Sequence, residues 1–199
     1  LTAFFYGFRD REKVLDILEQ TTGGRLIQTY NTIGGVQADI HPDFVRKVKE
    51  FIAYMRPVLR EYHEIFTGNV IAQERLKGTG VLTREDAISF GATGGTGRAA
   101  GWACDVRKRH PYAVYGKVDF EEALFTEGDC LARYMVRMRE IEQSMHIIEQ
   151  LIDNIPEGEY QLKMKPVIRI PEGSYYAARE AAASSGSSSR VGATSSPTA

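Results

Sequence analysis

A long one-sided helix near the end of the chain most constrains the fold. Over residues 129–154, apolar side chains recur every three or four positions, the spacing that places them on one face of a helix. A helix over this range spans about 39 Å, and Pro156 and Gly158 follow it as stop signals. Such a face has to pack against other helices, so the pattern predicts a helix bundle. The face consists of Leu131, Met135, Met138, Ile141, Met145, Ile148 and Ile152.

A second long apolar stripe supports the same architecture. The pattern over residues 42–66 begins with Pro42, which suits the first turn of a helix because its missing N–H is no loss there. Pro57 lies inside the pattern, so we expect a kink or a break near Arg56. The stripe is formed by Phe44, Val48, Phe51, Ile52, Met55, Leu59, Tyr62 and Phe66.

Shorter elements complete the predicted fold. Helices are expected over residues 10–21, capped by Asp10, and over residues 83–91, capped by Thr83. Apolar residues alternate with polar ones around residues 160–170, which indicates one or two strands. The predicted class is therefore mainly α (α+β), with a helical bundle core and small β elements.

The overall composition excludes several classes of protein. The 199 residues carry 25 basic and 26 acidic side chains, so a net charge of −1 gives no support for nucleic-acid binding. The mean hydropathy is −0.29, and no apolar run approaches the ~18 residues that a membrane helix needs. The two cysteines, Cys104 and Cys130, are too few for a disulfide scaffold or a four-thiolate metal site. They fit a reducing compartment.

The last part of the sequence differs in kind from the rest. Residues 181–199 consist mostly of Ser, Ala and other small residues, which cannot bury enough apolar surface to offset their chain entropy. We therefore expect one ordered domain over residues 1–180 and a disordered Ser/Ala-rich tail over residues 181–199. The abrupt change also motivates the hypothesis that the tail is a frameshift artefact.

The Gly-rich segment over residues 91–101 has three interpretations. Gly95, Gly97 and Ala100 resemble a dinucleotide fingerprint, but that motif needs a preceding strand and a following helix, and the pattern predicts neither. A tight structural loop, in which backbones approach closely, is the favoured interpretation. The third is a loop that lines a functional cavity, with Arg98 as its fixed charge.

Other chemical signals have plain structural interpretations. The basic run Arg107–His110 is short and is more typical of a solvated or salt-bridged surface than of nucleic-acid contact. Cys104 and Cys130 lack ligand spacing and are expected to behave as small buried hydrophobes. The methionines of the 129–154 stripe indicate core packing rather than ligand contact.

Asp39 is the carboxylate with the most specific chemical possibility. The plain interpretation is a helix-capping residue just ahead of Pro42. The alternative is a carboxylate that orients a histidine from elsewhere, which fixes the ring tautomer and raises its basicity. His41 could itself be an acid/base group, whereas His63 and His146 are expected to be ordinary helix residues.

Several motifs in sequence resemble one family, the D subunit of proton-translocating NADH:quinone oxidoreductase (respiratory complex I). The matches run in order from Leu1 to about Glu180, which makes them far more specific together than any one alone. The segments that carry the resemblance are Leu1–Lys13, which is similar to "T..FF..F..REK"; Thr29–Asp39, to "Y.R.GGV..D"; Arg98–Lys108 with Pro111–Tyr115, to "RGSG...D.RK" and "PY..Y"; and Gly128–Arg137 with Glu140, Ser144, Ile147 and Ile148, to "GD...RY..R..E...S..II".

The resemblance implies a fold and a site. The fold is that of the nickel–iron hydrogenase large-subunit superfamily, of which this chain represents the middle portion. Asp39 matches the family's aspartate that hydrogen-bonds a quinone-site histidine, a residue expected upstream of Leu1. Arg98 matches a motif near the interior and is a second, weaker site candidate close to the cavity. Ala99 and Ala100 depart from the motif, which has Gly-Ser there.

The resemblance also implies a place in a larger assembly. The protein lies in the peripheral arm, on the cytoplasmic side of the bacterial inner membrane, and has no transmembrane segment. Quinone is the substrate, while NADH and the iron–sulfur clusters are bound by other subunits, and no metal is expected on this chain. The partners implied are the neighbouring iron–sulfur subunit, the C subunit and the membrane-arm subunits, without nucleic acid.

Two other function classes stay open. A hydrogenase-like large subunit would need two Cys-x-x-Cys pairs, and this chain contains only Cys104 and Cys130. A non-catalytic helical interaction module is the second alternative. In either case we expect the isolated chain to lack catalytic activity and to expose apolar surface.

Overall fold

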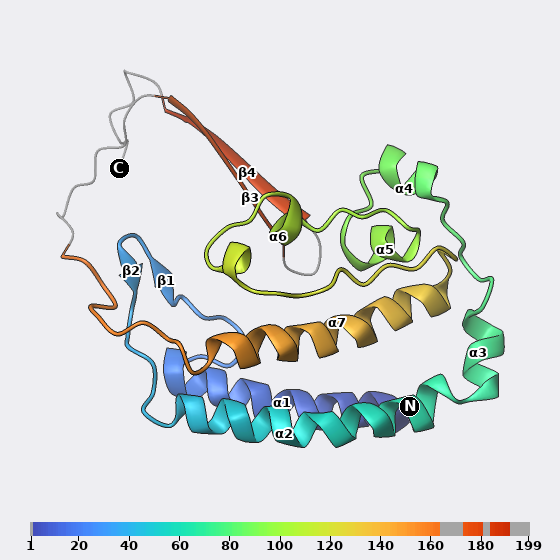
Figure 1. Cartoon of the computed structure of the whole chain (residues 1–199), viewed down its shortest axis with the longest axis horizontal. Helices are drawn as coiled ribbons and strands as arrows, with labels where there is room; N and C mark the ends of the chain where they lie inside the picture. Colours follow the sequence, from blue (N-terminus) through green and yellow to red (C-terminus); the bar gives the residue numbers. More distant parts are fainter. Residues whose placement is uncertain (1, 164–172, 181–183, 192–199) are drawn as a thin grey trace. The chain divides into compact units, whose positions relative to one another are not determined.

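Helices dominate the described part of the chain, and each strand belongs to a two-stranded pair. Figure 1 shows the computed structural model, which describes residues 2–163, 173–180 and 184–191. In chain order the elements are α1 (Thr2–Thr22), β1 (Asn31–Thr32), β2 (Gly35–Val36), α2 (Phe44–Tyr62), the π-helical turn η1 (His63–Thr67), α3 (Val70–Leu76), α4 (Arg84–Ser89), α5 (Gly94–Ala99), α6 (Val106–Arg109), the 3-10 turn η2 (Tyr115–Lys117), α7 (Cys130–Leu151), β3 (Gly173–Glu180) and β4 (Ser184–Val191). The expected mainly α fold with small β elements is confirmed.

The chain divides into two compact units, and each unit is built from two separate stretches of sequence. Unit 1 comprises Leu1–Glu74 and Met145–Pro166, and unit 2 comprises Arg75–Ser144 and Val167–Ala199. The long helix α7 begins in unit 2 and ends in unit 1.

In unit 1, α1 and α2 lie side by side and run antiparallel (Figure 1). The apolar stripe expected over residues 42–66 is buried along α2, as its spacing predicts. Its buried members are Val48, Ile52, Met55 and Leu59, and Val58, which is outside the predicted stripe, is buried as well. The end of α7 joins this pair through ion pairs between Lys49 and Asp153 and between Arg56 and Glu149.

The helix boundaries in unit 1 differ from the expected ones. Helix α1 begins at Thr2, so Asp10 lies inside the helix and does not cap it. The break expected near Arg56 is absent, because α2 continues through Pro57 to Tyr62. The backbone widens instead at η1, where His63 Nδ1 and Thr67 Oγ1 lie 2.9 Å apart. Turns of this kind accommodate an extra residue in a helix.

A small hairpin, β1–β2, follows α1 in unit 1. Its two strands pair antiparallel, and Gly35 forms an isolated bridge with Gln161. Gly35 has a φ of +150°, and a Cβ there would lie 2.2 Å from the carbonyl oxygen of Tyr160. Only glycine fits this approach of two backbones. Of the strands expected around residues 160–170, the structure describes this bridge, while residues 164–170 lie outside the described part.

Unit 2 packs short helices against the first half of α7. Its buried core consists of Ala99, Ala123, Ala132 and Val136, with Phe125 packed against them. Small side chains let the backbones approach, so the segment before α7 hydrogen-bonds directly to α5: Phe125 N–H donates to Arg98 O at 3.0 Å. The expected cap of the 83–91 helix is confirmed, since Thr83 Oγ1 accepts the Asp86 N–H.

The Gly-rich segment over residues 91–101 is not a loop throughout, because α5 forms inside it. Gly97 explains why the segment is rich in glycine: a Cβ there would lie 2.4 Å from the Ala92 carbonyl oxygen and 3.1 Å from the Trp102 ring. The close backbone approach that the favoured interpretation required is therefore present. Packing overrides the low helix propensity of glycine in this short helix.

Helix α7 confirms the strongest sequence prediction, although it starts one residue later and ends three residues earlier than expected. Asp129 stands just before it as the cap: the Ala132 N–H donates to its Oδ1 at 2.7 Å. The Gly78 N–H donates to its Oδ2 at 2.8 Å, so the same carboxylate also fixes the preceding loop. Met138 and Met145 are buried, in agreement with a core role for the methionine stripe.

Residues 184–191 correct the expectation of a disordered tail. They form β4, which pairs antiparallel with β3 from Gly173↔Val191 to Glu180↔Ser184. Strand pairing uses backbone groups, which a Ser-rich segment supplies as well as any other. Residues 181–183 and 192–199 lie outside the described part, so the boundary expected at residue 180 stays a prediction.

Exposed apolar side chains are frequent in the described part of the chain, as expected. The most exposed of the large ones are Ile27 at 89 %, Phe90 at 78 %, Tyr176 at 76 % and Leu26 at 69 %. None of the helices that the structure describes combines the length and apolar character that crossing a membrane requires.

Candidate functional site

Asp39 lies in unit 1, in the segment that leads from the β1–β2 hairpin to α2. Its side chain is exposed, and its Oδ1 accepts the N–H of Ile40 at 2.8 Å. The hairpin holds this segment in place, because the Tyr30 hydroxyl donates to Ala38 O at 2.7 Å and the Gln37 N–H donates to Tyr30 O at 3.0 Å. Burial and the negative charge of Asp39 raise the pKa of Tyr30.

A hollow of about 440 Å³ opens beside Asp39 within unit 1. Its walls are mostly apolar, and three carboxylates stand around it. One of them, Asp153, is already paired with Lys49, whereas Asp39 has no ion-pair partner among the described residues. The lining residues are Asp39, Ile40, Val45, Ile152, Asp153, Ile155, Pro156, Glu157 and Gly158. A carboxylate with an available oxygen beside an apolar hollow suits a hydrogen-bonding role toward an incoming polar group.

The capping interpretation of Asp39 is wrong. Helix α2 begins at Phe44 with Asp43 as its cap residue, and the Asp39 carboxylate bonds to Ile40 instead. His41 does not pair with Asp39 either, because its Nδ1 accepts the N–H of Asp43 at 3.1 Å. Asp39 is therefore free to serve a group from outside this segment.

Arg98, the second candidate, lies in unit 2 on α5 and is 2 % exposed. Its Nη2 lies 2.6 Å from Glu140 Oε1 on α7, and its Nε donates to the same oxygen at 2.8 Å. A buried guanidinium needs such a partner, since an unpaired charge in the interior is costly. Burial and pairing support a role in fixing α5 on α7.

Asp105, just before α6, is a buried carboxylate that belongs to the matched 98–108 motif but that the sequence did not mark as a site candidate. It is fully buried and accepts hydrogen bonds from the side chain and the backbone N–H of Arg107. Burial alone would raise the pKa of Asp105, but the bonds and the charge of Arg107 outweigh it and lower that pKa. Its partner Arg107 belongs to the basic run Arg107–His110, so one member of that run is salt-bridged, in agreement with the expected solvated or salt-bridged surface.

Asp10 was also missed, because a helix start was assigned to it. It is 3 % exposed and accepts the Tyr54 hydroxyl at 2.7 Å, the Arg9 Nε at 2.8 Å, and the Tyr62 hydroxyl. These bonds outweigh the effect of burial, so the pKa of Asp10 is lowered, while burial and Asp10 raise the pKa of Tyr62. Tyr54 and Tyr62 are eight residues apart and share one helix face, which is the signal that could have revealed the network.

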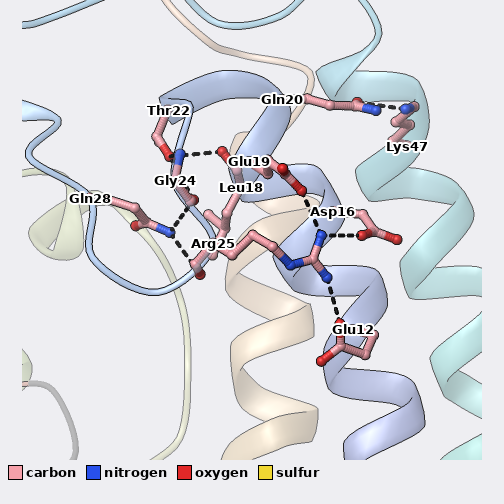
Figure 2. A network of polar contacts seen from close by, with 10 residues as sticks. All are labelled: Glu12, Asp16, Leu18, Glu19, Gln20, Thr22, Gly24, Arg25, Gln28 and Lys47. Carbon is pink, nitrogen blue, oxygen red and sulfur yellow. Dashed lines mark hydrogen bonds and ion pairs between the residues drawn. The ribbon is translucent and has the colours of Figure 1, made fainter.

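A further polar network connects the segment that follows α1 to the surface of that helix. Figure 2 shows Arg25 folded back onto three carboxylates of α1, with Glu12 and Glu19 at 2.5 Å and Asp16 at 2.7 Å. Nearby, Lys47 of α2 reaches Gln20 at 2.5 Å. All four members of the Arg25 cluster are substantially exposed, so the network orders the chain after α1 without forming an enclosed site.

The metal and nucleotide interpretations gain no support from the geometry. Cys104 and Cys130 form no disulfide and are half-buried, and Cys130 Sγ accepts from Arg133 at 3.2 Å. Within the described ranges, no group of three or more His, Cys, Asp or Glu side chains could hold a metal ion. The helix within the Gly-rich segment, α5, is six residues long and follows the helix α4 rather than a strand, unlike a dinucleotide-binding motif.

Comparison with known proteins identifies a family. Residues 1–191 match the family described as "Respiratory-chain NADH dehydrogenase, 49 Kd subunit". The chain is 84 % identical over 180 residues to the C/D subunit of the NADH-quinone oxidoreductase of Phocaeicola vulgatus, covering 90 % of this chain and 35 % of that protein. It is 46 % identical over 178 residues to the D subunit of the same enzyme from Desulfotalea psychrophila, covering 89 % and 48 %.

A solved structure agrees with the sequence matches. The chain resembles a subunit in the structure of the membrane-bound sulfane sulfur reductase, an archaeal respiratory membrane complex, with a TM-score of 0.85 and 37 % identity. The likeness covers 90 % of this chain and 50 % of that one. The chain thus spans between a third and a half of the length of these relatives.

Proposed function

Because the chain belongs to the family of the 49 kDa subunit of respiratory-chain NADH dehydrogenases, we propose that it forms part of the quinone-reduction cavity of an NADH:quinone oxidoreductase. In this role it lies near the terminal iron–sulfur cluster, and electrons from NADH reach quinone beside it. The observation that carries the proposal is the match over residues 1–191 together with the available Asp39 carboxylate at the apolar hollow.

Asp39 acts in this proposal as a positioning residue for a quinone-site histidine outside the chain. One carboxylate oxygen is held by the Ile40 N–H, and the other accepts the imidazole N–H. The bond orients the ring and stabilises its imidazolium form, from which a proton passes to the reduced quinone and leaves neutral imidazole. The apolar side chains of the hollow, including Ile40, Val45 and Ile155, offer contact to the apolar part of an incoming group.

The proposal places the remaining chemistry on other chains. Quinone is the substrate, NADH and the iron–sulfur clusters bind to other subunits, and Arg98 holds α5 in place near the cavity. The partners are the iron–sulfur neighbour, the C subunit and the membrane-arm subunits. The protein is peripheral, on the cytoplasmic side of the bacterial inner membrane, in an enzyme that couples electron transfer to proton translocation. The exposed apolar side chains of the described residues support burial against such partners.

The hydrogenase-like alternative is less well supported. It needs two Cys-x-x-Cys pairs, and this chain has neither. Its relatives at 84 % and 46 % identity carry the name NADH-quinone oxidoreductase. These two observations favour quinone over hydrogen as the substrate of the enzyme to which the chain belongs.

The test is the Asp39→Asn substitution in the complete oxidoreductase. Asparagine keeps the shape but removes the charge that supports the imidazolium, so NADH:quinone activity should fall by about 100-fold. Electron transfer from NADH to ferricyanide should stay unchanged. The pH profile of quinone reduction should also move to lower pH, because the histidine loses basicity; a purely structural role would not produce that shift.

Glu157→Gln is the matched control, since Glu157 lines the same hollow and is not the proposed partner of the histidine. It should retain near-normal quinone activity and an unchanged pH profile. Full quinone activity in the Asp39→Asn enzyme, or equal losses in both variants, would overturn the proposed role of Asp39.

A further inference from the structure

Tyr30, within unit 1, contacts the segment that carries Asp39 at two points. Its backbone oxygen accepts the N–H of Gln37 at 3.0 Å, and its side-chain hydroxyl donates to Ala38 O at 2.7 Å. This Ala38 oxygen belongs to the planar peptide group that joins Ala38 to Asp39. A hydrogen bond to that oxygen fixes the plane from which the backbone of Asp39 continues. The direction of Asp39 therefore depends on the Tyr30 hydroxyl.

Asp39 itself lies in an irregular segment, which ends where α2 begins at Phe44. Its own carboxylate provides a local bond, because its Oδ1 accepts the N–H of Ile40 at 2.8 Å. That bond moves with Asp39 and does not tie it to the rest of unit 1. Since an irregular segment forms few backbone hydrogen bonds, loss of a bond to a neighbouring element increases its motion. The hydroxyl of Tyr30 supplies such a bond.

We propose that Tyr30 is a positioning residue for quinone reduction, whose hydroxyl holds the peptide before Asp39 so that the available carboxylate oxygen meets the quinone-site histidine. This role rests on the proposed function of Asp39. Hydrogen bonds weaken steeply as their angle departs from linear, and small misplacements of a catalytic group lower the rate. Tyr30 contacts neither the quinone nor the histidine and acts through Asp39.

The hairpin beside Tyr30 has an anchor of its own. The Val36 N–H donates to Tyr160 O at 3.0 Å, and the Leu162 N–H donates to Gly34 O at 3.0 Å. These bonds join backbone groups and do not involve the Tyr30 hydroxyl. Removal of the hydroxyl should therefore loosen the segment after the hairpin and leave the hairpin in place.

The surroundings of the hydroxyl agree with this role. Burial and the negative charge of Asp39 raise the pKa of Tyr30 above its ordinary value of 10. The phenol thus keeps its proton and stays a donor to Ala38 O throughout the neutral range. Tyr30 is not among the described residues that line the hollow beside Asp39. Its hydroxyl acts on the carboxylate through the backbone rather than by shaping the hollow.

The first experiment compares Tyr30→Phe with Tyr160→Phe in the complete oxidoreductase. Phenylalanine keeps the ring and removes only the hydroxyl. NADH:quinone activity should fall about 3- to 10-fold in Tyr30→Phe, the size expected for loss of one neutral hydrogen bond. The pH profile of quinone reduction should move to lower pH, in the same direction as in Asp39→Asn, and electron transfer to ferricyanide should stay unchanged.

Tyr160→Phe is the matched control. Tyr160 is 47 % exposed and contacts the same hairpin through its backbone oxygen, which the substitution keeps. This variant should retain the quinone activity and the pH profile of the parent enzyme. A shift of the pH profile in Tyr30→Phe alone separates positioning of Asp39 from a general weakening of the hairpin.

A double variant tests whether Tyr30 acts through Asp39. Tyr30→Phe combined with Asp39→Asn should be no slower than Asp39→Asn alone, because the group that Tyr30 positions is already lost. Residues that act independently would instead give losses that multiply.

Hydrogen exchange measures the positioning without reference to catalysis. In the complete oxidoreductase, the amides of residues 37–40 should exchange faster in Tyr30→Phe than in Tyr160→Phe or the parent, because the segment has lost a bond to the hairpin. The amides of β1 and β2 should exchange at the parent rate in both variants.

Unchanged exchange at residues 37–40 in Tyr30→Phe, or multiplying losses in the double variant, would overturn the role of Tyr30 while leaving that of Asp39 intact. Failure of Tyr30→Phe to assemble would do the same, because a hydroxyl that the fold requires has a structural role. Full quinone activity in Asp39→Asn would contradict the proposed function itself, and the role of Tyr30 with it.

Discussion

Arg25 in unit 1 and Arg98 in unit 2 both bind carboxylates, but in opposite settings. Arg25 contacts three carboxylates within 2.7 Å, and the side chains involved are 36–62 % exposed. Arg98 contacts Glu140 from a side chain that is 3 % exposed. A count of ion pairs alone would predict that Arg25 contributes more to stability than Arg98 does. Burial reverses this order. Water screens the charges of the Arg25 cluster, whereas the buried Arg98 is screened little, so loss of one partner there leaves an uncompensated charge.

The largest effect is expected for Arg98→Met. Methionine is also a long, unbranched side chain, but it carries no charge. The substitution therefore leaves the Glu140 carboxylate without its cation in a largely buried position, which costs about 3–5 kcal/mol of unfolding free energy. Urea denaturation followed by circular dichroism at pH 7 measures the loss. A cost below about 1 kcal/mol would show that solvent reaches the pair and that the contrast with Arg25 does not hold.

A middle-sized, pH-dependent effect is expected for Asp105→Asn. Loss of the bonds to Arg107 should cost about 1–3 kcal/mol at pH 7. The pKa of Asp105 is lowered from its ordinary value of 3.8, so its contribution is present above that pH and disappears as the pH falls through the folded pKa. The variant should therefore lose less stability than the parent between pH 4 and pH 2, which acid titration of the unfolding free energy measures.

Asp16→Asn is the matched control from the Arg25 cluster. It removes one of three exposed carboxylates, so it should leave the acid titration close to that of the parent chain. Equal acid profiles for Asp105→Asn and the parent would contradict the ionised, Arg107-paired state of Asp105.

The smallest effect is expected for Arg25→Met. Its partners lie on the exposed face of α1 and keep their water when the arginine is removed. The unfolding midpoint should stay within measurement error in 0.5 M salt, with a small decrease detectable at low salt, where screening is weaker. A large decrease that persists in high salt would mean that the fold of the segment after α1 depends on this cluster.

Periodicity predicted the helices well where one face is buried. Residues 129–154 and 42–66 correspond to α7 and to α2 with η1. Their apolar stripes supply seven of the buried core residues of the described chain: Val48, Ile52, Met55, Leu59, Met138, Met145 and Ile152. The apolar pattern did not predict α5, because three glycines in six residues disfavour a helix. Packing against α7 stabilises this helix. The pattern also failed at α1, whose first turns carry exposed aromatics that no periodic stripe explains.

The polar networks could not be predicted, because they join residues that are distant in sequence. Nothing near Asp10 indicates that Tyr54 and Tyr62 donate to it. The chemistry of Asp39 left two interpretations open, helix cap or histidine partner, and the motif resemblance favoured the second. The structure adds that its carboxylate is available and that His41 is engaged elsewhere.

The division of unit 1 into two stretches has a consequence for biosynthesis. The Thr32 and Gln161 side chains, which meet beside the hairpin, are 129 positions apart in sequence, and Lys49 and Asp153 are 104 apart. On the ribosome, α1 and α2 emerge long before the end of α7 that completes their unit. Contacts of such separation form late, because the loop must close before they yield stability. The buried face of α2 therefore stays incomplete during translation, and this is the interval in which the nascent chain depends most on chaperones.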